Sequence, residues 1–314
     1  MKRTFLSICL AILAAALPVQ AQRTDAAAWV IADSATGVVL DSSSATRSLQ
    51  VGSITKIATA MVVLDWAAAK GEDLGQKATV PGTIALISSP NSIGLQPGDQ
   101  ISLRDALYAG LMQSDNQAAE TLAAHVGRKI SGAQTDQEAI VAFVAQMNAL
   151  ARRLGLRNTR FLNAHGLDDL ESKMPYSTAA DVATLTNYAL GHGGFLFYTS
   201  QKERRIGWAT ATGEASGYQL RNTNELLGTG GVDGVKTGTT RKSGPCVVLT
   251  SAQRPDSKQV GEQHVIVPRR LTVVVLGSQA RFETGKMLLA RGWELLDQWA
   301  AAGRPAKGWK PSAQ

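Results

Sequence analysis

The sequence predicts an α+β fold, in which an antiparallel sheet is flanked by helices and carries an inserted all-helical subdomain at roughly residues 80–200. Three observations lead to this prediction. An apolar hairpin pattern opens the chain after its leader, helical patterns fill the middle, and strand-like runs followed by one helix close it. Strands that are separated from helices along the chain favour an α+β organisation over a parallel, doubly wound sheet.

The N-terminal elements are predicted to be a β-hairpin and a buried helix. Apolar runs at Ala28–Ala32 and Val38–Leu40 flank a turn that contains Gly37, as in a hairpin. The stretch after Ser53 is apolar almost all round, which is typical of a buried helix. A loop-rich segment with three prolines follows at 71–100.

The middle of the chain is predicted to contain four helices. Ser102 and Thr135 are suitable N-cap residues, and Glu138 completes a capping box with Thr135. The expected helices span residues 102–112, 116–126, 135–155 and 178–191.

From Val232 onward the pattern changes to strands. Cys246–Thr250 and Leu271–Leu276 are apolar runs of strand length, and a last helix is expected at Glu283–Ala301. The segment 254–270 between the two runs is longer than a tight hairpin needs.

Residues 1–21 are predicted to be an export signal rather than part of the fold. Lys2 and Arg3 precede an apolar run, and small residues lead to a cleavage site near Ala21. The signal would leave one domain at 22–303 and a polar tail at 304–314. We expect this mature chain to act in the periplasm or another extracytoplasmic space, soluble and without a stable membrane anchor.

Charge and cysteine content exclude several classes. Removal of residues 1–21 takes away Lys2, Arg3 and Cys9. The formal net charge falls from +7 to +5, and Cys246 is left as the only cysteine, which rules out an internal disulfide. A modest positive charge suits an anionic envelope polymer. The sequence contains no basic cluster with interleaved aromatics and no His/Cys/carboxylate group at metal-ligand spacing. Neither nucleic acid, a metal nor another cofactor is therefore expected.

Three short motifs occur in order along the chain: Ser53-Ile54-Thr55-Lys56, Ser114-Asp115-Asn116 and Lys236-Thr237-Gly238. By chance an S-x-x-K arises about once in a chain of this length, and a K-T-G roughly a tenth as often. A second S-x-N, at Ser89-Pro90-Asn91, lies in a proline-bearing turn and is interpreted as a loop. The combination and order of the motifs are thus far more specific than any one of them.

In this order the motifs resemble those of the penicillin-recognising serine acyl-transferases. The chain is most similar to the low-molecular-weight penicillin-binding proteins that act as D-alanyl-D-alanine carboxypeptidases, and to their DD-endopeptidase relatives. Segments 161–168, 177–181 and 232–240 support the resemblance. It implies a β-lactamase/DD-peptidase-like fold, a substrate in peptidoglycan stem peptides ending in D-Ala-D-Ala, and inhibition by β-lactam antibiotics.

The residue types of the first motif suit acyl transfer. On a helix, Ser53 and Lys56 at positions i and i+3 lie on one side, so that the amine can reach the hydroxyl. Lys56 can take the serine proton only when neutral, and burial together with the positive charge of Lys236 would lower its pKa. Ser53 at a helix N-terminus also offers its N–H to a developing oxyanion.

The resemblance implies roles for the other motif residues. Ser114 would pass a proton to the leaving amine, and Asn116 would orient Lys56 and the substrate amide. The K-T-G strand and an arginine at the last strand–helix junction would bind substrate; the implied residues are Lys236, Thr237, Gly238, Thr239 and Arg281. Lys236, Thr237 and Arg281 would hold the terminal carboxylate, and the Thr239 N–H would donate to the oxyanion. Gly238 would leave room for the substrate to lie against the strand.

His165 is interpreted as a structural residue, since the chain has only four histidines and none at triad spacing. Cys246 follows a glycine-proline pair and enters a strand, so it is interpreted as a core residue rather than a nucleophile. A class A β-lactamase would need an E-x-x-L-N segment, which is absent between Asn116 and Lys236. A non-catalytic wall-binding protein has no support, because every motif residue is present. A DD-endopeptidase activity that cleaves cross-links remains an open alternative. The segment that starts at Ser114 resembles the corresponding segment of endopeptidases, whereas the segment that starts at His165 resembles that of carboxypeptidases.

Overall fold

The computed structural model describes residues 24–168, 173–260 and 262–309. The predicted export signal at 1–21 and residues 310–314 of the predicted tail lie outside the described residues. Among the described helices, none has the length and apolar character needed to cross a membrane.

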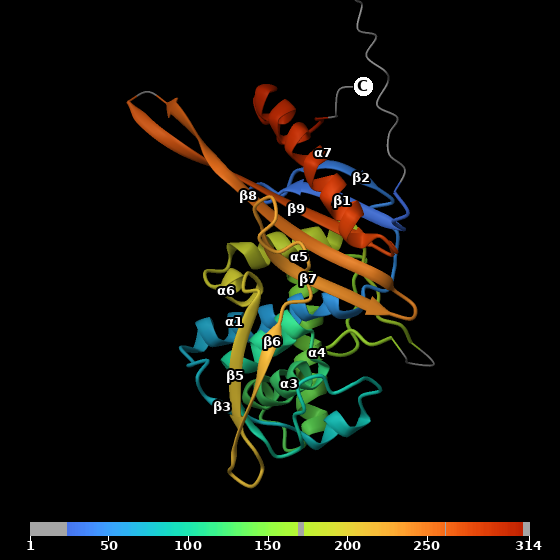
Figure 1. The fold of residues 1–314 in the computed structure, drawn as a ribbon, viewed down its shortest axis with the longest axis vertical. Helices are drawn as coiled ribbons and strands as arrows, with labels where there is room; N and C mark the ends of the chain where they lie inside the picture. Colours follow the sequence, from blue (N-terminus) through green and yellow to red (C-terminus); the bar gives the residue numbers. More distant parts are fainter. Residues whose placement is uncertain (1–23, 169–172, 261, 310–314) are drawn as a thin grey trace, which may run out of the picture.

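The main sheet joins the two ends of the chain, as the sequence predicts. Its strand order is β2-β1-β9-β8-β7, and every neighbouring pair is antiparallel (Figure 1). The strands are β1 (Ala28–Asp33), β2 (Val39–Ser43), β7 (Val232–Thr240), β8 (Gly244–Val260) and β9 (Gln263–Leu276).

Helices bury both faces of this sheet. Along β9, Leu271, Val273 and Val275 pack with the helix α7 (Arg281–Ala301), whereas Val274 and Leu276 belong to the core on the opposite face. This alternation follows from the two-residue period of a strand. The predicted last helix is therefore confirmed, and the sheet is held between α7 and the helical part of the molecule.

The helical part lies between β2 and β7 in the sequence. Its caps are those predicted: the Ser102 hydroxyl accepts from Asp105 N–H at 3.0 Å, and Thr135 with Glu138 forms a capping box. The helices are α1 (Lys56–Lys70), α2 (Leu103–Tyr108), α3 (Asn116–Ser131), α4 (Asp136–Arg153), α5 (Ala179–Gly191) and α6 (Phe195–Thr199), with short turns η1 (Gly52–Thr55), η2 (Gly82–Leu86) and η3 (Ala109–Gln113).

A second, four-stranded sheet was not predicted. It has the order β3-β4-β5-β6 and consists of β3 (Lys77–Thr79), β4 (Gln100–Ser102), β5 (Glu203–Ala209) and β6 (Ala215–Arg221). The first two strands have only three residues each, and β5 begins Glu-Arg-Arg and contains a glycine. None of these strands therefore has the apolar run from which a strand can be predicted. The predicted fold class is confirmed, with this small sheet as an addition to its helical part.

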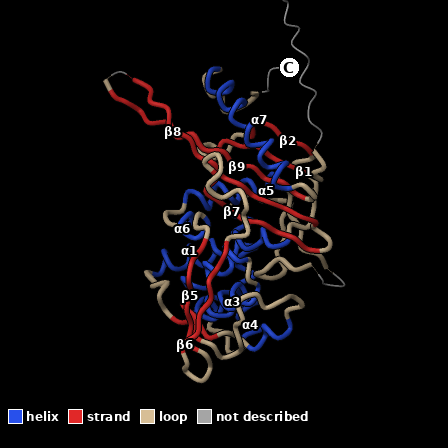
Figure 2. The backbone as a smooth tube through the Cα atoms, in the orientation of Figure 1, coloured by secondary structure: helices blue, strands red, loops and turns tan. Residues whose placement is uncertain are grey.

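The segment 254–270 is not a loop. Beyond Gln253 the strands β8 and β9 continue as a two-stranded ribbon that leaves the main sheet (Figure 2). A register shift between Gln253 and Asp256 marks the point of departure, and Asp256 is held there by Arg304 at 2.8 Å.

Candidate active site

Ser53 lies in the tight turn η1, immediately before helix α1. The backbone reaches this turn through Gly52, whose φ of 54° is a conformation that favours glycine. Lys56 begins α1, and its Nζ lies 2.9 Å from Ser53 Oγ. The spacing predicted from the first motif therefore produces the expected hydrogen bond.

The Lys56 amine is held by groups from three separate parts of the chain. Besides Ser53 Oγ, Nζ donates to Asn116 Oδ1 at 2.6 Å and to the His165 carbonyl at 2.9 Å. The side chain is only 1% exposed. Burial lowers the pKa of Lys56 to about 7, against the opposing effect of the Asp115 carboxylate.

Burial, which the sequence predicted as one of two causes, lowers the pKa of Lys56. The charge of Lys56 in turn affects Lys236: after burial, the charge of Lys56 and that of Arg281 lower the pKa of Lys236 well below its usual range. A proton on either of these buried amines disfavours a proton on the other.

A pH dependence follows from the lowered pKa. If acylation requires neutral Lys56, its rate should fall about tenfold for each pH unit below 7 and level off above about pH 8. The measurement is the second-order rate constant of labelling by a fluorescent penicillin between pH 5 and 9. A rate that is flat across this range would contradict the assignment of Lys56 as the base.

Ser114 ends the π-turn η3 in a left-handed conformation, with φ 64°. A serine pays a conformational cost there, and such residues gather at functional sites. The next residue fixes the corner: Asp115 caps α3 by accepting from Ala118 N–H at 2.7 Å, and it also accepts from Ser92 Oγ at 2.7 Å. This corner places Asn116 at the first turn of α3, facing Lys56.

Ser89 is a neighbour of the site that sequence reasoning missed. Asn116 Nδ2 donates to Ser89 Oγ at 2.7 Å, which fixes the amide so that its oxygen points at Lys56. The turn at 89–91 had been interpreted as a plain loop. The signal was the serine-rich stretch 88–92 itself, which supplies hydroxyls to both Asp115 and Asn116.

Strand β7 packs directly on the turn that carries Ser53. A Cβ built on Gly238 would lie 2.8 Å from the Val51 carbonyl oxygen and 3.1 Å from Ser53 N, both backbone atoms. One built on Gly52 would lie 3.4 Å from Thr239 N. Gly238 thus allows the strand and the turn to touch, and its expected role in leaving room for substrate stays a prediction.

Substituting Gly238 by alanine should therefore separate β7 from η1. We expect a loss of about 1–3 kcal/mol in stability from overpacking and a fall in penicillin labelling of roughly a hundredfold or more, since the two elements hold the reacting groups together. Thermal unfolding and labelling rates measure the two effects. Gly207→Ala on β5 is the control, because its added Cβ would find only an ordinary contact at 3.5 Å.

The remaining predicted residues line β7 and the start of α7. Lys236 is buried, and its Nζ donates to the Thr237 carbonyl at 3.0 Å. Arg281 Nη1 donates to Thr239 Oγ1 at 2.9 Å and to the Gly238 carbonyl at 3.1 Å. The structure thus brings Arg281 to the K-T-G strand, although 42 residues separate it from Thr239.

His165 contributes through its backbone rather than its ring. Burial lowers the pKa of the imidazole to about 3, so the ring is a poor base near neutral pH, and its carbonyl is the group that meets Lys56. Three residues on, the buried Asp168 accepts a hydrogen bond from Thr240 Oγ1, which ties this segment to the end of β7. Cys246 is fully buried, in line with its structural interpretation.

Comparisons with known proteins agree with this geometry. Residues 15–260 match the peptidase S11 family, described as D-alanyl-D-alanine carboxypeptidase. The chain is 34% identical over 295 residues to the D-alanyl-D-alanine carboxypeptidase DacC of Escherichia coli, covering 90% of this chain and 65% of that protein. It is 32% identical over 241 residues to a D-alanyl-D-alanine endopeptidase of Pseudomonas aeruginosa, covering 75% of this chain and 69% of that protein.

Solved structures show the same likeness. The Streptomyces K15 DD-transpeptidase superposes with a TM-score of 0.73 at 26% identity, covering 88% of this chain and 100% of that one. Cefotaxime-bound penicillin-binding protein D2 of Listeria monocytogenes superposes with a TM-score of 0.66 at 27% identity, covering 86% of this chain and 98% of that one. The fold predicted from the sequence is therefore confirmed. With the family match over most of the length, these likenesses show that the chain belongs to the peptidase S11 family of serine D-alanyl-D-alanine carboxypeptidases.

Proposed function

We propose that this chain removes the terminal D-alanine from peptidoglycan stem peptides that end in D-Ala-D-Ala, through an acyl-enzyme on Ser53. One observation carries the proposal. The buried Lys56 amine, with a pKa near 7, lies 2.9 Å from Ser53 Oγ and is fixed by two further acceptors, so a base is positioned for that hydroxyl.

Acylation would begin when neutral Lys56 takes the Ser53 proton and Oγ attacks the carbonyl carbon of the penultimate D-alanine. The oxyanion that forms would accept from the N–H groups of Ser53 and Thr239, which flank the contact between η1 and β7. Breaking the C–N bond requires a proton on the leaving amine. Ser114, in its strained corner, would deliver that proton from Lys56.

Hydrolysis of the acyl-enzyme would complete the cycle. Lys56 is neutral again once its proton has left with D-alanine, and it can take a proton from a water that attacks the ester carbonyl. The C–O bond to Ser53 then breaks as Lys56 returns that proton to Ser53 Oγ, and the shortened peptide leaves with a new carboxylate. Asn116 keeps the amine in place through both halves of the reaction.

The terminal carboxylate of the substrate would lie against β7. Lys236, Thr237 and Arg281 supply cationic and hydroxyl donors on one strand and the adjoining helix start. The pKa of Lys236 is lowered in the free enzyme by burial and by the charges of Lys56 and Arg281. An arriving carboxylate would favour protonation of Lys236, so that substrate binding and charge at this site would reinforce each other.

β-Lactams would acylate Ser53 and leave slowly. The sequence between Asn116 and Lys236 has no E-x-x-L-N segment to activate a deacylating water. The cefotaxime-bound state of the Listeria neighbour supports this part of the proposal. We further propose that residues 1–21 direct export, that 22–303 are the catalytic domain, and that the enzyme works outside the cytoplasmic membrane.

Product analysis tests the proposed reaction. Purified protein is incubated with a pentapeptide monomer and, separately, with cross-linked muropeptide dimers. We expect free D-alanine and tetrapeptide from the monomer, with the dimers at least tenfold slower. Conversion of dimers to monomers without D-alanine release would instead identify a DD-endopeptidase, the activity of the Pseudomonas relative.

A further inference from the structure

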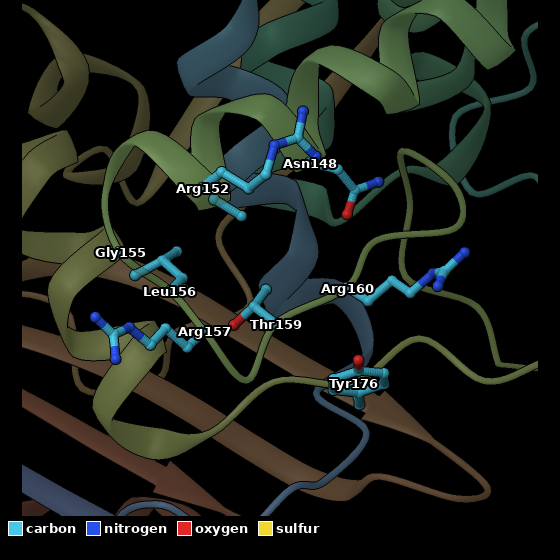
Figure 3. Close-up of a pocket in the computed structure, with 9 residues that line it drawn as sticks. Asn148, Arg152, Gly155, Leu156, Arg157, Thr159, Arg160 and Tyr176 are labelled. Atoms are coloured by element: carbon cyan, nitrogen blue, oxygen red, sulfur yellow. The ribbon is translucent and has the colours of Figure 1, made fainter.

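A polar hollow lies at the C-terminal end of helix α4, outside the site around Ser53. Its volume is about 650 Å³. Figure 3 shows it between the last turn of α4, the loop that follows, and the aromatic ring of Tyr176. Its lining residues are Asn148, Ala151, Arg152, Gly155, Leu156, Arg157, Thr159, Arg160 and Tyr176.

The described residues that line this hollow carry three positive charges and no carboxylate. Arg152, Arg157 and Arg160 are exposed, and none of them forms an ion pair with any described residue. The adjacent Arg153 behaves differently, because it pairs with Asp65 at 2.8 Å.

The carboxylate next to this loop has other partners. Asp181 accepts from Asn158 N–H at 3.0 Å and from Thr159 Oγ1 at 2.7 Å. Arg152 can be explained as a cation at a helix C-terminus, but Arg157 and Arg160 lie beyond the helix. Within residues 24–168, 173–260 and 262–309, the guanidinium groups of Arg152, Arg157 and Arg160 therefore have no ion-pair partner.

Guanidinium groups bind carboxylates and phosphates through paired N–H donors. In Figure 3 the guanidinium groups of Arg152, Arg157 and Arg160 lie around the rim of the hollow and point away from one another. A single small anion would meet one of them, whereas an extended ligand with several spaced carboxylates would meet all three. The partly exposed ring of Tyr176 adds an apolar face against which the body of such a ligand can lie.

The hollow is joined to the active site by a short piece of chain. Arg160 and Tyr176 exchange backbone hydrogen bonds at 2.9 and 3.1 Å, and the next residue, Ser177, pairs with Leu49, just before η1. From Arg160 the chain runs to His165, whose carbonyl holds Lys56. Five residues span at most ~18 Å, so one stretch of polymer could reach both places.

We propose that this arginine hollow is an exosite that binds the carboxylates of a second peptidoglycan stem peptide while the first lies at Ser53. The identity of the polymer rests on the proposed function, whereas the anion-binding character of the hollow does not. The exosite would raise the affinity for polymeric peptidoglycan and leave the cleavage of short peptides unchanged.

The test compares two triple variants with equal loss of charge. The hollow variant, Arg152→Gln/Arg157→Gln/Arg160→Gln, removes the three positive charges of the hollow. The control variant, Lys70→Gln/Lys77→Gln/Arg205→Gln, removes three exposed cations from α1 and the second sheet. All proteins carry Ser53→Ala, so that binding to isolated sacculi is measured by sedimentation without turnover. We expect at least fivefold weaker binding for the hollow variant and less than twofold for the control.

Activity with Ser53 restored provides the second readout. We expect kcat/KM for a soluble acyl-D-Ala-D-Ala tripeptide within twofold of the parent in both variants, and a higher KM on sacculi only in the hollow variant. Equal sacculus binding by both variants would overturn the exosite. Displacement by inorganic phosphate at lower concentration than by a soluble disaccharide tripeptide would also overturn it, in favour of a phosphate site. A parent that releases no D-alanine would contradict the proposed function and leave the binding result standing.

Discussion

Replacing Ser53 by alanine is expected to abolish covalent labelling by fluorescent penicillin and to lower D-alanine release by about 10⁴-fold or more. The mutation removes the one hydroxyl among the described residues to which the Lys56 amine donates, so no acyl-enzyme can form. Labelling followed by gel fluorescence, and D-alanine assayed in solution, measure the two effects.

The matched control is Ser42→Ala, which removes an exposed hydroxyl on β2. It should label at the rate of the parent, and both variants should unfold at the parent's temperature within a few degrees. Persistent labelling of the Ser53→Ala protein would place the acylated residue elsewhere and refute the mechanism. Wild-type protein that takes no label would contradict penicillin reactivity itself.

Replacing Lys56 is expected to have the second largest effect, a loss of about 10³-fold in the acylation rate. Arginine at this position keeps a positive charge and hydrogen-bond donors for Asn116 and His165, but it cannot deprotonate in a protein. Methionine keeps the length of the side chain and removes the amine altogether. Both variants should lose acylation, and any residual rate should lose its inflection near pH 7.

Stability separates loss of the base from loss of the fold. Lys56→Arg places a larger group in a fully buried position, so it should unfold at a lower temperature than the parent. Lys56→Met buries no charge, although it leaves Asn116 Oδ1 and the His165 carbonyl without this donor. A folded variant of either kind that acylates within tenfold of the parent would show that Lys56 is not the base.

Much of the fold could be predicted because its signals are local. The capping box at Thr135 and Glu138 and the Ser102 cap involve residues three apart, and the structure contains both. The hairpin pairs β1 with β2, the next strand in the sequence, and its turn residues lie directly between the two strands. In each case the residues that form the interaction are neighbours in the printed sequence.

What was missed depends on contacts between distant segments. Strand β4 pairs with β3, about 20 residues before it, and with β5, about 100 residues after it. With only three residues, β4 is too short to show an alternating apolar pattern. The hydrogen bond from Asn116 to Ser89 joins residues 27 apart. Burial was predicted as one cause of the lowered Lys56 pKa, but that it outweighs the effect of neighbouring charges is a property of the assembled core and not of the S-x-x-K motif.

The motifs themselves came together as the sequence indicated. Lys56 meets Asn116, and Gly238 lies against the turn of Ser53. For Gly238 the structure adds a close approach between two backbone segments to the predicted room for substrate, and this approach joins segments that lie far apart in the sequence. The roles of these residues in catalysis stay predictions for the variants described above.

The three acceptors of Lys56 also make penicillin a probe of folding. Asn116 and His165 stand 60 and 109 residues away from it along the chain. Helix α1 can form from local interactions, but contacts of such sequence separation close late and slowly. During refolding from denaturant, recovery of helical circular dichroism should therefore precede recovery of labelling, and the delay between them would time the assembly of α1 with α3 and with the segment that carries His165.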